Sequence, residues 1–148
     1  MYIERVRRYF PDANISADVI VGFPGETEAD FEVTAEFCRK ADFLNLHIFP
    51  YSPREGTEAA EMDGQLPETE KKRRVSELEA VHAKTQKALL ERYSERTSPV
   101  HVLFEQKKNG YLIGHSEHYV EFKVKGPTEL VGKICPVMPM ADGTAVLI

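Results

Sequence analysis

The spacing of apolar and polar residues divides the chain into a part with helices and strands and a later part with strands alone. Apolar residues at helical spacing predict a first helix over residues 2–10, which Pro11 ends. Two short apolar runs, Ile15–Gly22 and Phe43–Pro50, are typical of strands that are buried on both faces. The first half of the chain therefore predicts an α/β arrangement.

A second helix is predicted between these two strands. Thr27 is its expected N-cap, Asp30 is the capping-box partner, and the helix continues to about Ala41. A strand, a helix and a strand with short connections form a βαβ unit, so the two strands should be parallel. Because two parallel strands need further strands and helices around them, we expect this unit to be the end of a larger sheet.

The rest of the chain predicts a long helix and a small β-barrel. Residues 51–66 should form a loop, and Pro67 opens a polar helix that runs to about Arg96. After Pro99, short strand signals recur about every ten residues between turn residues, which is typical of a small barrel. These strands are Val100–Phe104, Tyr111–Gly114, Tyr119–Lys125, Leu130–Val137 and Thr144–Ile148. We expect three parts, namely residues 1–66, 67–97 and 98–148.

Composition adds limits to this picture. The hydrophobic content of 42% and charged content of 29% are typical of a globular protein, and the apolar runs are only strand-sized. We therefore expect a cytoplasmic protein with no membrane segment, in which Cys38 and Cys135 are reduced, buried thiols. The net charge of −5 disfavours a nucleic-acid binder. However, the acidic residues gather in residues 1–66, so the later parts can present a basic face to phosphate.

Two runs contain the candidate chemistry of the α/β part. The run Asp18–Thr27, DVIVGFPGET, places glycines at the end of a strand, where ligands of parallel sheets approach the backbone. A tight strand-to-helix turn without a ligand explains the same pattern equally well. In the run His47–Thr57, HIFPYSPREGT, alternation places His47, Phe49 and Tyr51 on one face. The alternative for His47 is a core histidine whose hydrogen bonds are satisfied.

Together these runs resemble the fifth and sixth strands of radical S-adenosylmethionine enzymes, and the second is similar to tRNA methylthiotransferases. Its LHIFPYS form most resembles the enzymes that act on threonylcarbamoyladenosine beside the anticodon. The resemblance implies the end of a partial (β/α) barrel whose strand ends contact S-adenosylmethionine. The implied cofactor-binding residues are Ile20, Gly22, Phe23, Pro24, Glu26, His47, Phe49 and Tyr51.

The terminal strands resemble a TRAM domain, an RNA-binding module with a five-stranded antiparallel barrel similar to the oligonucleotide-binding fold. The segment Lys108–Val120, KNGYLIGHSEHYV, is the basis of this resemblance. RNA recognition needs cations for phosphate and flat rings for unstacked bases. The implied RNA-binding residues are Lys108, Tyr111, His115, His118, Tyr119, Lys123 and Lys125. Without the resemblance, the favoured interpretation is a rim of half-buried tyrosines and a solvated lysine face.

The cysteine content limits what the chain can do alone. Radical S-adenosylmethionine chemistry needs a 4Fe-4S cluster on a closely spaced cysteine triad, which Cys38 and Cys135 cannot form. We therefore expect a C-terminal segment of such an enzyme, inactive alone, without catalytic or metal-binding residues. Its expected partners are the tRNA anticodon stem-loop and a missing N-terminal portion that holds the clusters.

Two other interpretations remain open from the sequence. One is a non-catalytic RNA-binding protein that uses the barrel alone, and the other is a fragment without stable function, because a half-sheet exposes apolar surface. The basic run Lys71–Arg74 on the long helix is interpreted as a solvated face, with a role in steering tRNA as the alternative.

Overall fold

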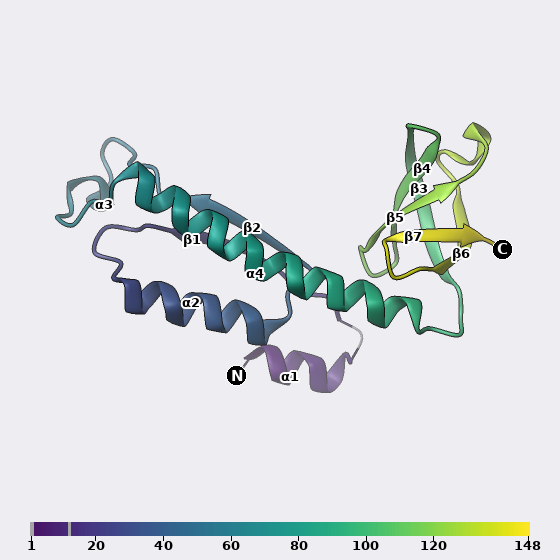
Figure 1. Ribbon diagram of the computed structural model, residues 1–148, viewed down its shortest axis with the longest axis horizontal. Helices are drawn as coiled ribbons and strands as arrows, with labels where there is room; N and C mark the ends of the chain where they lie inside the picture. The colour runs from purple at the N-terminus through teal and green to yellow at the C-terminus, as the bar shows by residue number, and fades with distance from the viewer. Residues whose placement is uncertain (1, 12) are drawn as a thin grey trace. The chain divides into compact units, whose positions relative to one another are not determined.

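Residues 15–86 form one structural unit, and residues 1–14 together with 87–148 form a second. The structure is a computed structural model that describes residues 2–11 and 13–148 (Figure 1). None of its described helices has a stretch long and apolar enough to cross a membrane. The predicted boundaries of the three parts stay a prediction.

The first unit is built on two parallel strands. β1 (Ser16–Val21) pairs with β2 (Asn45–Pro50) in parallel, as the βαβ pattern predicted. In this register Asp18 lies opposite His47, and Ile20 lies opposite Phe49. The carboxyl ends of both strands therefore lie at the same edge of the sheet.

The connecting helix, α2 (Glu28–Ala41), begins with the capping box that the sequence predicted. The Asp30 backbone N–H donates to Thr27 Oγ1 at 3.2 Å, and the Thr27 N–H donates to Asp30 Oδ2 at 3.0 Å. Such a cap stabilises a helix by about 1 kcal/mol. Phe31, Ala35 and Cys38 repeat at helical spacing and form the buried face of α2. Burial also raises the pKa of the Cys38 thiol.

The long helix α4 (Glu68–Ser94) begins directly after Pro67, and Leu78 in its first part is fully buried. The segment of residues 51–66, predicted to be a loop, contains one helical turn, α3 (Glu58–Glu61). Four residues are too few for a helical period to show in a sequence, which is why the pattern did not predict this turn.

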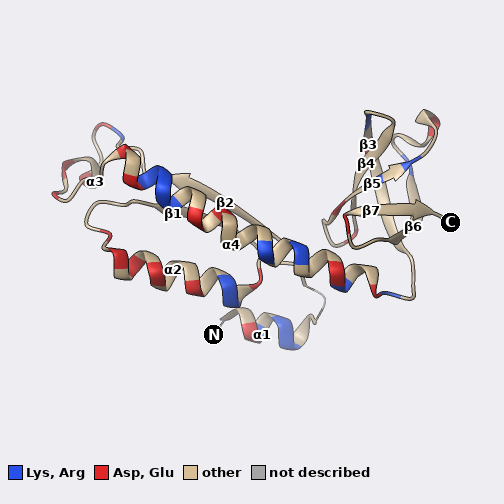
Figure 2. Ribbon diagram, in the orientation of Figure 1, with Lys and Arg blue, Asp and Glu red and all other residues tan. Residues whose placement is uncertain are grey.

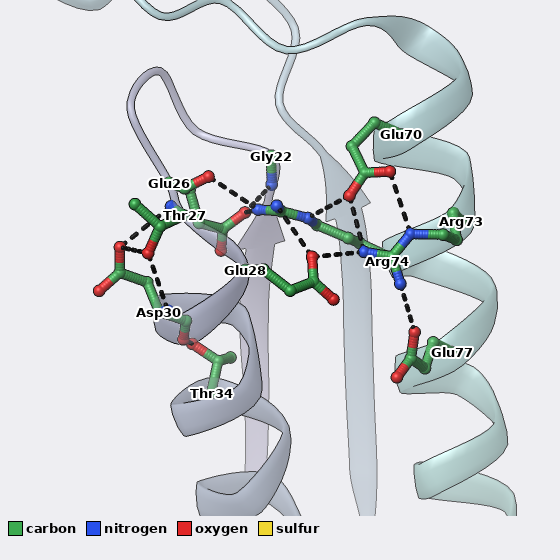
Figure 3. Close-up of polar contacts among 10 residues, drawn as sticks. All are labelled: Gly22, Glu26, Thr27, Glu28, Asp30, Thr34, Glu70, Arg73, Arg74 and Glu77. Carbon is green, nitrogen blue, oxygen red and sulfur yellow. Dashed lines mark hydrogen bonds and ion pairs between the residues drawn. The ribbon is translucent and has the colours of Figure 1, made fainter.

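One face of the two-stranded sheet is open. The side chains of Ile20 and Phe49 are 56% and 51% exposed, and Asp18 and His47 are exposed beside them, whereas Val21 is buried. In Figure 3, α2 lies in front of β1 and α4 lies beside the end of β2. The prediction that both faces of the strands are buried is therefore wrong for this chain, because helices cover only one of them.

In the second unit, five strands close into a barrel in the order β3-β4-β5-β7-β6, which confirms the predicted small barrel. The barrel is not entirely antiparallel, because β5 and β7 pair in parallel. The predicted strand start at Leu130 falls in a single 3-10 turn, η1 (Thr128–Leu130), so β6 begins later. A separate helix, α1 (Tyr2–Tyr9), ends before Pro11 as predicted. The strands are β3 (Val100–Lys108), β4 (Tyr111–Ser116), β5 (Glu121–Lys125), β6 (Ile134–Pro139) and β7 (Thr144–Leu147).

A close approach between β3 and β4 requires glycine at one position. The pairing register shifts between Phe104 and Gln106, and Gly114 lies opposite Phe104. A Cβ atom on Gly114 would lie 2.0 Å from the carbonyl oxygen of Leu103 and 2.8 Å from Phe104 Cα. Since these neighbours are backbone atoms, β3 would have to move to accept any side chain.

We predict that Gly114→Ala destabilises the barrel by about 1–3 kcal/mol or more, because overpacking against backbone cannot be relieved by a rotamer change. Urea unfolding followed by circular dichroism measures the loss. The matched control is Gly126→Ala, whose added methyl would meet the end of the Leu112 side chain at 2.7 Å. Equal stability of Gly114→Ala and the unchanged chain would contradict the prediction.

Candidate functional site

The loop that follows β1 forms a closed turn held by its own groups. Gly22 and Gly25 have φ values of +73° and +80°, which favour glycine. The Gly22 N–H donates to Glu26 Oε2, and the Glu26 N–H donates to the carbonyl oxygen of Phe23 at 2.9 Å. The Gly25 N–H donates to the carbonyl oxygen of Gly64 at 3.0 Å. The backbone N–H groups of Gly22, Gly25 and Glu26 in the predicted cofactor loop therefore all donate to acceptors within the protein.

A buried arginine of α4 connects this loop to the helix (Figure 3). The Arg74 side chain is only 4% exposed, and its Nη1 donates to Glu26 Oε2 at 2.6 Å and to the Glu26 carbonyl oxygen at 3.1 Å. Its Nε donates to Glu70 Oε1 at 2.9 Å. The guanidinium also lies 5.4 Å from the centroid of the Phe31 ring. Arg74 therefore joins β1, α2 and α4 at the carboxyl edge of the sheet.

The neighbouring Arg73 forms the exposed side of the same network. It pairs with Glu28 at 2.6 Å, Glu70 at 2.7 Å and Glu77 at 2.7 Å. Hydrogen bonds from Arg73 and Arg74 lower the pKa of Glu70 from 4.5 to about 2. Because this pKa is lowered by folding, the carboxylate stabilises the fold above pH 4.5 and loses that effect as the pH falls towards 2.

The basic run Lys71–Arg74 is only in part the solvated face that its composition suggested, because Lys72 and Arg73 are exposed but Lys71 and Arg74 are buried. Lys71 is only 3% exposed, and its alkyl chain fills the space beside Gly22, where a Cβ would lie 2.6 Å from Lys71 Cγ. Figure 2 shows acidic residues flanking this basic turn of α4. Positions 71, 74 and 78 share one helical face, and this spacing was the signal in the sequence that the run faces inward.

Tyr51 lies just beyond the end of β2 and is buried, unlike His47 and Phe49. The alternation predicted that Tyr51 shares a face with His47 and Phe49. This prediction is wrong, because Tyr51 is buried and the other two are exposed. Its ring makes an edge contact with Phe23 at 5.2 Å, and Lys71 Nζ lies 5.4 Å from its centroid. Among the residues that the structure describes, the buried Tyr51 hydroxyl has no hydrogen-bond partner.

The structure divides the eight predicted cofactor residues into two groups. Five lie at the carboxyl edge of the sheet: Gly22, Phe23, Pro24, Glu26 and Tyr51. Three lie on the open face: Ile20, His47 and Phe49. Their contacts with a cofactor stay a prediction.

The residues on the open face suit a nucleoside-bearing cofactor better than the loop does. Ile20 and Phe49 offer an apolar wall for a flat ring, with polar groups of Asp18 and His47 beside it. In contrast, the N–H of Gly22 and the carbonyl oxygen of Val21 are already bonded, to Glu26 and to the Tyr51 N–H. The residues do not fit an iron–sulfur cluster: within the described part of the chain, no group of three His, Cys, Asp or Glu residues could hold a metal ion.

A second candidate surface covers the outside of the barrel. Lys125 Nζ lies 5.9 Å from the centroid of the Tyr111 ring. Two hollows of about 460 and 520 Å³ both have Tyr111 and Lys123 in their walls, and Lys108 lines the larger one. Cations and an aromatic ring therefore lie together here, as RNA binding requires.

The remaining three RNA candidates separate into two places. His115 and Tyr119 stack on each other with ring centroids 4.7 Å apart. The His118 ring instead lies 6.4 Å from the Tyr93 ring, and its carbonyl oxygen accepts a hydrogen bond from Asn14 Nδ2 at 2.8 Å. The structure thus brings six candidates to the outer surface and places His118 against α4. Their binding of RNA stays a prediction.

The chain thus has two candidate binding surfaces, one on the open face of the two-stranded sheet and one on the outside of the closed barrel. No family model matches the chain. It is 33% identical over 144 residues to a threonylcarbamoyladenosine tRNA methylthiotransferase of Bacillus subtilis, covering 95% of this chain and 32% of that protein. It is 42% identical over 134 residues to a tRNA-2-methylthio-N(6)-dimethylallyladenosine synthase of Maricaulis maris, covering 89% of this chain and 29% of that protein.

A synthase of the same description from Aquifex aeolicus is 41% identical over 140 residues, covering 91% of this chain and 30% of that protein. The chain therefore matches a C-terminal portion of the tRNA methylthiotransferases. It spans about a third of the length of these curated relatives.

We predict that Arg74→Met destabilises the first unit by about 3–5 kcal/mol, because it leaves the partly buried Glu26 carboxylate without its cation. Arg73→Met is the matched control, one position away, and should cost about 1 kcal/mol or less, since its ion pairs are exposed. Chemical denaturation of both variants measures the difference. Equal losses for the two arginines would show that burial of Arg74 does not decide its contribution.

Proposed function

We propose that this chain is the C-terminal part of a tRNA methylthiotransferase that modifies N6-threonylcarbamoyladenosine beside the anticodon. The observation that carries the proposal is the similarity, over about 90% of the chain, to enzymes whose names specify methylthio transfer to tRNA. The LHIFPYS form of the second strand favours threonylcarbamoyladenosine as the substrate. The higher identity to dimethylallyladenosine synthases makes dimethylallyladenosine the second candidate.

In this proposal the open face of the sheet forms part of a cofactor wall. S-adenosylmethionine supplies a reactive radical and a methyl group when it is bound to the complete enzyme. Ile20 and Phe49 exclude water from one side of that site, because both present apolar surface at the face that the helices leave open. The Arg74–Glu26 pair keeps the adjoining loop closed, so that Phe23 and Pro24 keep their positions while the ligand binds.

The barrel supplies the grip on tRNA in the same proposal. Lys108, Lys123 and Lys125 are exposed and surround Tyr111, which suits an anticodon stem-loop with phosphates and unpaired bases. We further propose that the cluster ligands lie in another portion of the enzyme and that the 148-residue chain is inactive alone. The free thiols Cys38 and Cys135 are compatible with the reducing cytoplasm, where we place the enzyme.

We predict that deletion of the gene for this protein removes one methylthio-modified adenosine from total tRNA. Mass spectrometry of digested tRNA should show loss of the 2-methylthio form of N6-threonylcarbamoyladenosine and accumulation of the form without sulfur. Loss of the 2-methylthio dimethylallyl nucleoside instead would move the substrate to the second candidate. An unchanged set of methylthio nucleosides would overturn the proposed function and leave the non-catalytic RNA binder as the better interpretation.

A further inference from the structure

The turn between β4 and β5 displays an aromatic stack on the outside of the barrel. The rings of His115 and Tyr119 are 4.7 Å apart with an interplanar angle of 24°. His115 covers one face of the Tyr119 ring. Because Tyr119 is 67% exposed, much of the rest of its side chain is accessible to a ligand. His115 Nδ1 lies 2.8 Å from Glu105 Oε2 and donates to this carboxylate. This hydrogen bond orients the His115 ring within the stack.

The backbone at Tyr119 is held in a conformation that aromatic residues rarely adopt. Its φ is +63°, in the left-handed region. The surrounding turn maintains it: the Tyr119 N–H donates to the carbonyl oxygen of Ser116 at 2.8 Å, and the Val120 N–H donates to Ser116 Oγ at 3.2 Å. Ser116 is itself buried. Strain of this kind persists where the surroundings enforce it and often marks a functional position.

Charge is divided along this face of the barrel. Tyr111 and His115 lie on β4 about 13 Å apart, from the rise of about 3.3 Å per residue in a strand. At the Tyr111 end, the facing residues in the β-ladder are Lys108 and Lys125. At the His115 end, Glu121 faces His115 across the β-ladder and Glu105 accepts its hydrogen bond. The lysine end therefore attracts phosphate, whereas the carboxylates at the stacked end repel it.

We infer that the His115–Tyr119 stack is a binding site for one unpaired nucleobase of RNA. An uncharged base can stack on the exposed Tyr119 face without the repulsion that a phosphate would meet there. The Glu105 and Glu121 carboxylates can accept hydrogen bonds from amino groups on the edge of a base. This inference rests on the proposed RNA-binding role of the barrel. It adds that the end of the barrel surface at His115 and Tyr119 binds a nucleobase and not a phosphate.

The test uses the 148-residue chain and two labelled probes, a hairpin RNA with an unpaired loop of mixed sequence and a blunt duplex RNA. Tyr119→Asn removes the ring but suits the left-handed backbone, because asparagine tolerates this region. Tyr119→Phe keeps the ring and is the matched control. Lys123→Glu with Lys125→Glu serves as the comparison for the phosphate contacts. Circular dichroism first establishes that each variant retains the barrel.

We predict that Tyr119→Asn weakens binding of the hairpin about 5- to 150-fold, whereas Tyr119→Phe binds like the unchanged chain. The slope of log affinity against log salt should not change with Tyr119→Asn, because a base contact releases no counterions. The lysine variant should lose about 0.7 of that slope for each phosphate contact removed. The fluorescence of 2-aminopurine in the hairpin loop should be quenched by the unchanged chain and not by Tyr119→Asn. Binding of the duplex should not depend on Tyr119.

If Tyr119→Asn binds the hairpin as tightly as the unchanged chain while the lysine variant is weakened, the base site is overturned and the RNA-binding role of the barrel stands. Absence of quenching in the unchanged chain would overturn the base site without any variant. If the unchanged chain shows no salt-sensitive binding of either probe, the proposed RNA-binding role fails, and the base site fails with it.

Discussion

The ion pair between Arg74 and Glu26 is the interaction on which the first unit depends. A guanidinium that is only 4% exposed is tolerated only when its hydrogen bonds are satisfied, and Glu26 and Glu70 provide them. Because Glu26 also accepts from the Gly22 N–H, one carboxylate determines both the end of β1 and the position of α4. Lys71 occupies the space that Gly22 leaves, so a side chain at residue 22 would displace the Lys71 side chain.

The carboxyl edge of the sheet is held by hydrogen bonds and ion pairs, whereas one face of the sheet is open. Polar groups of the loop from Gly22 to Glu26 are hydrogen-bonded within the loop and to Gly64 and Arg74, and α2 starts directly after the loop with a capped first turn. Ile20 and Phe49, on the other hand, have no covering element within the described part of the unit. In the proposed enzyme, the fixed edge orients the loop and the open face contacts the cofactor. RNA binding is assigned to a separate barrel whose surface has its own division of charge.

Features encoded by local chemistry could be predicted from the sequence. The strands β1 and β2 and the Thr27–Asp30 capping box depend on neighbouring residues, and the five barrel strands follow the spacing of turn residues. Features that depend on packing between distant parts of the chain could not be predicted from the sequence. The parallel pairing of β5 with β7 requires the closed barrel, and the burial of Lys71 and Arg74 requires the loop after β1 to supply Glu26 and Gly22. Charge alone suggested the opposite environment for these two residues. The roles of the cofactor and RNA residues stay predictions, since they depend on ligands.

In the proposed function, RNA binds to the barrel and not to the unit with the open sheet. The most direct measurement is a nuclear magnetic resonance titration of the isotope-labelled 148-residue chain with an anticodon stem-loop RNA. Because RNA binds to the barrel in this proposal, shifted amide resonances should be confined to the barrel and concentrate around Lys108, Tyr111, Tyr119 and Lys123, while residues 15–86 keep their resonances. Shifts centred on residues 15–86, or a barrel whose resonances do not respond to the RNA, would contradict it.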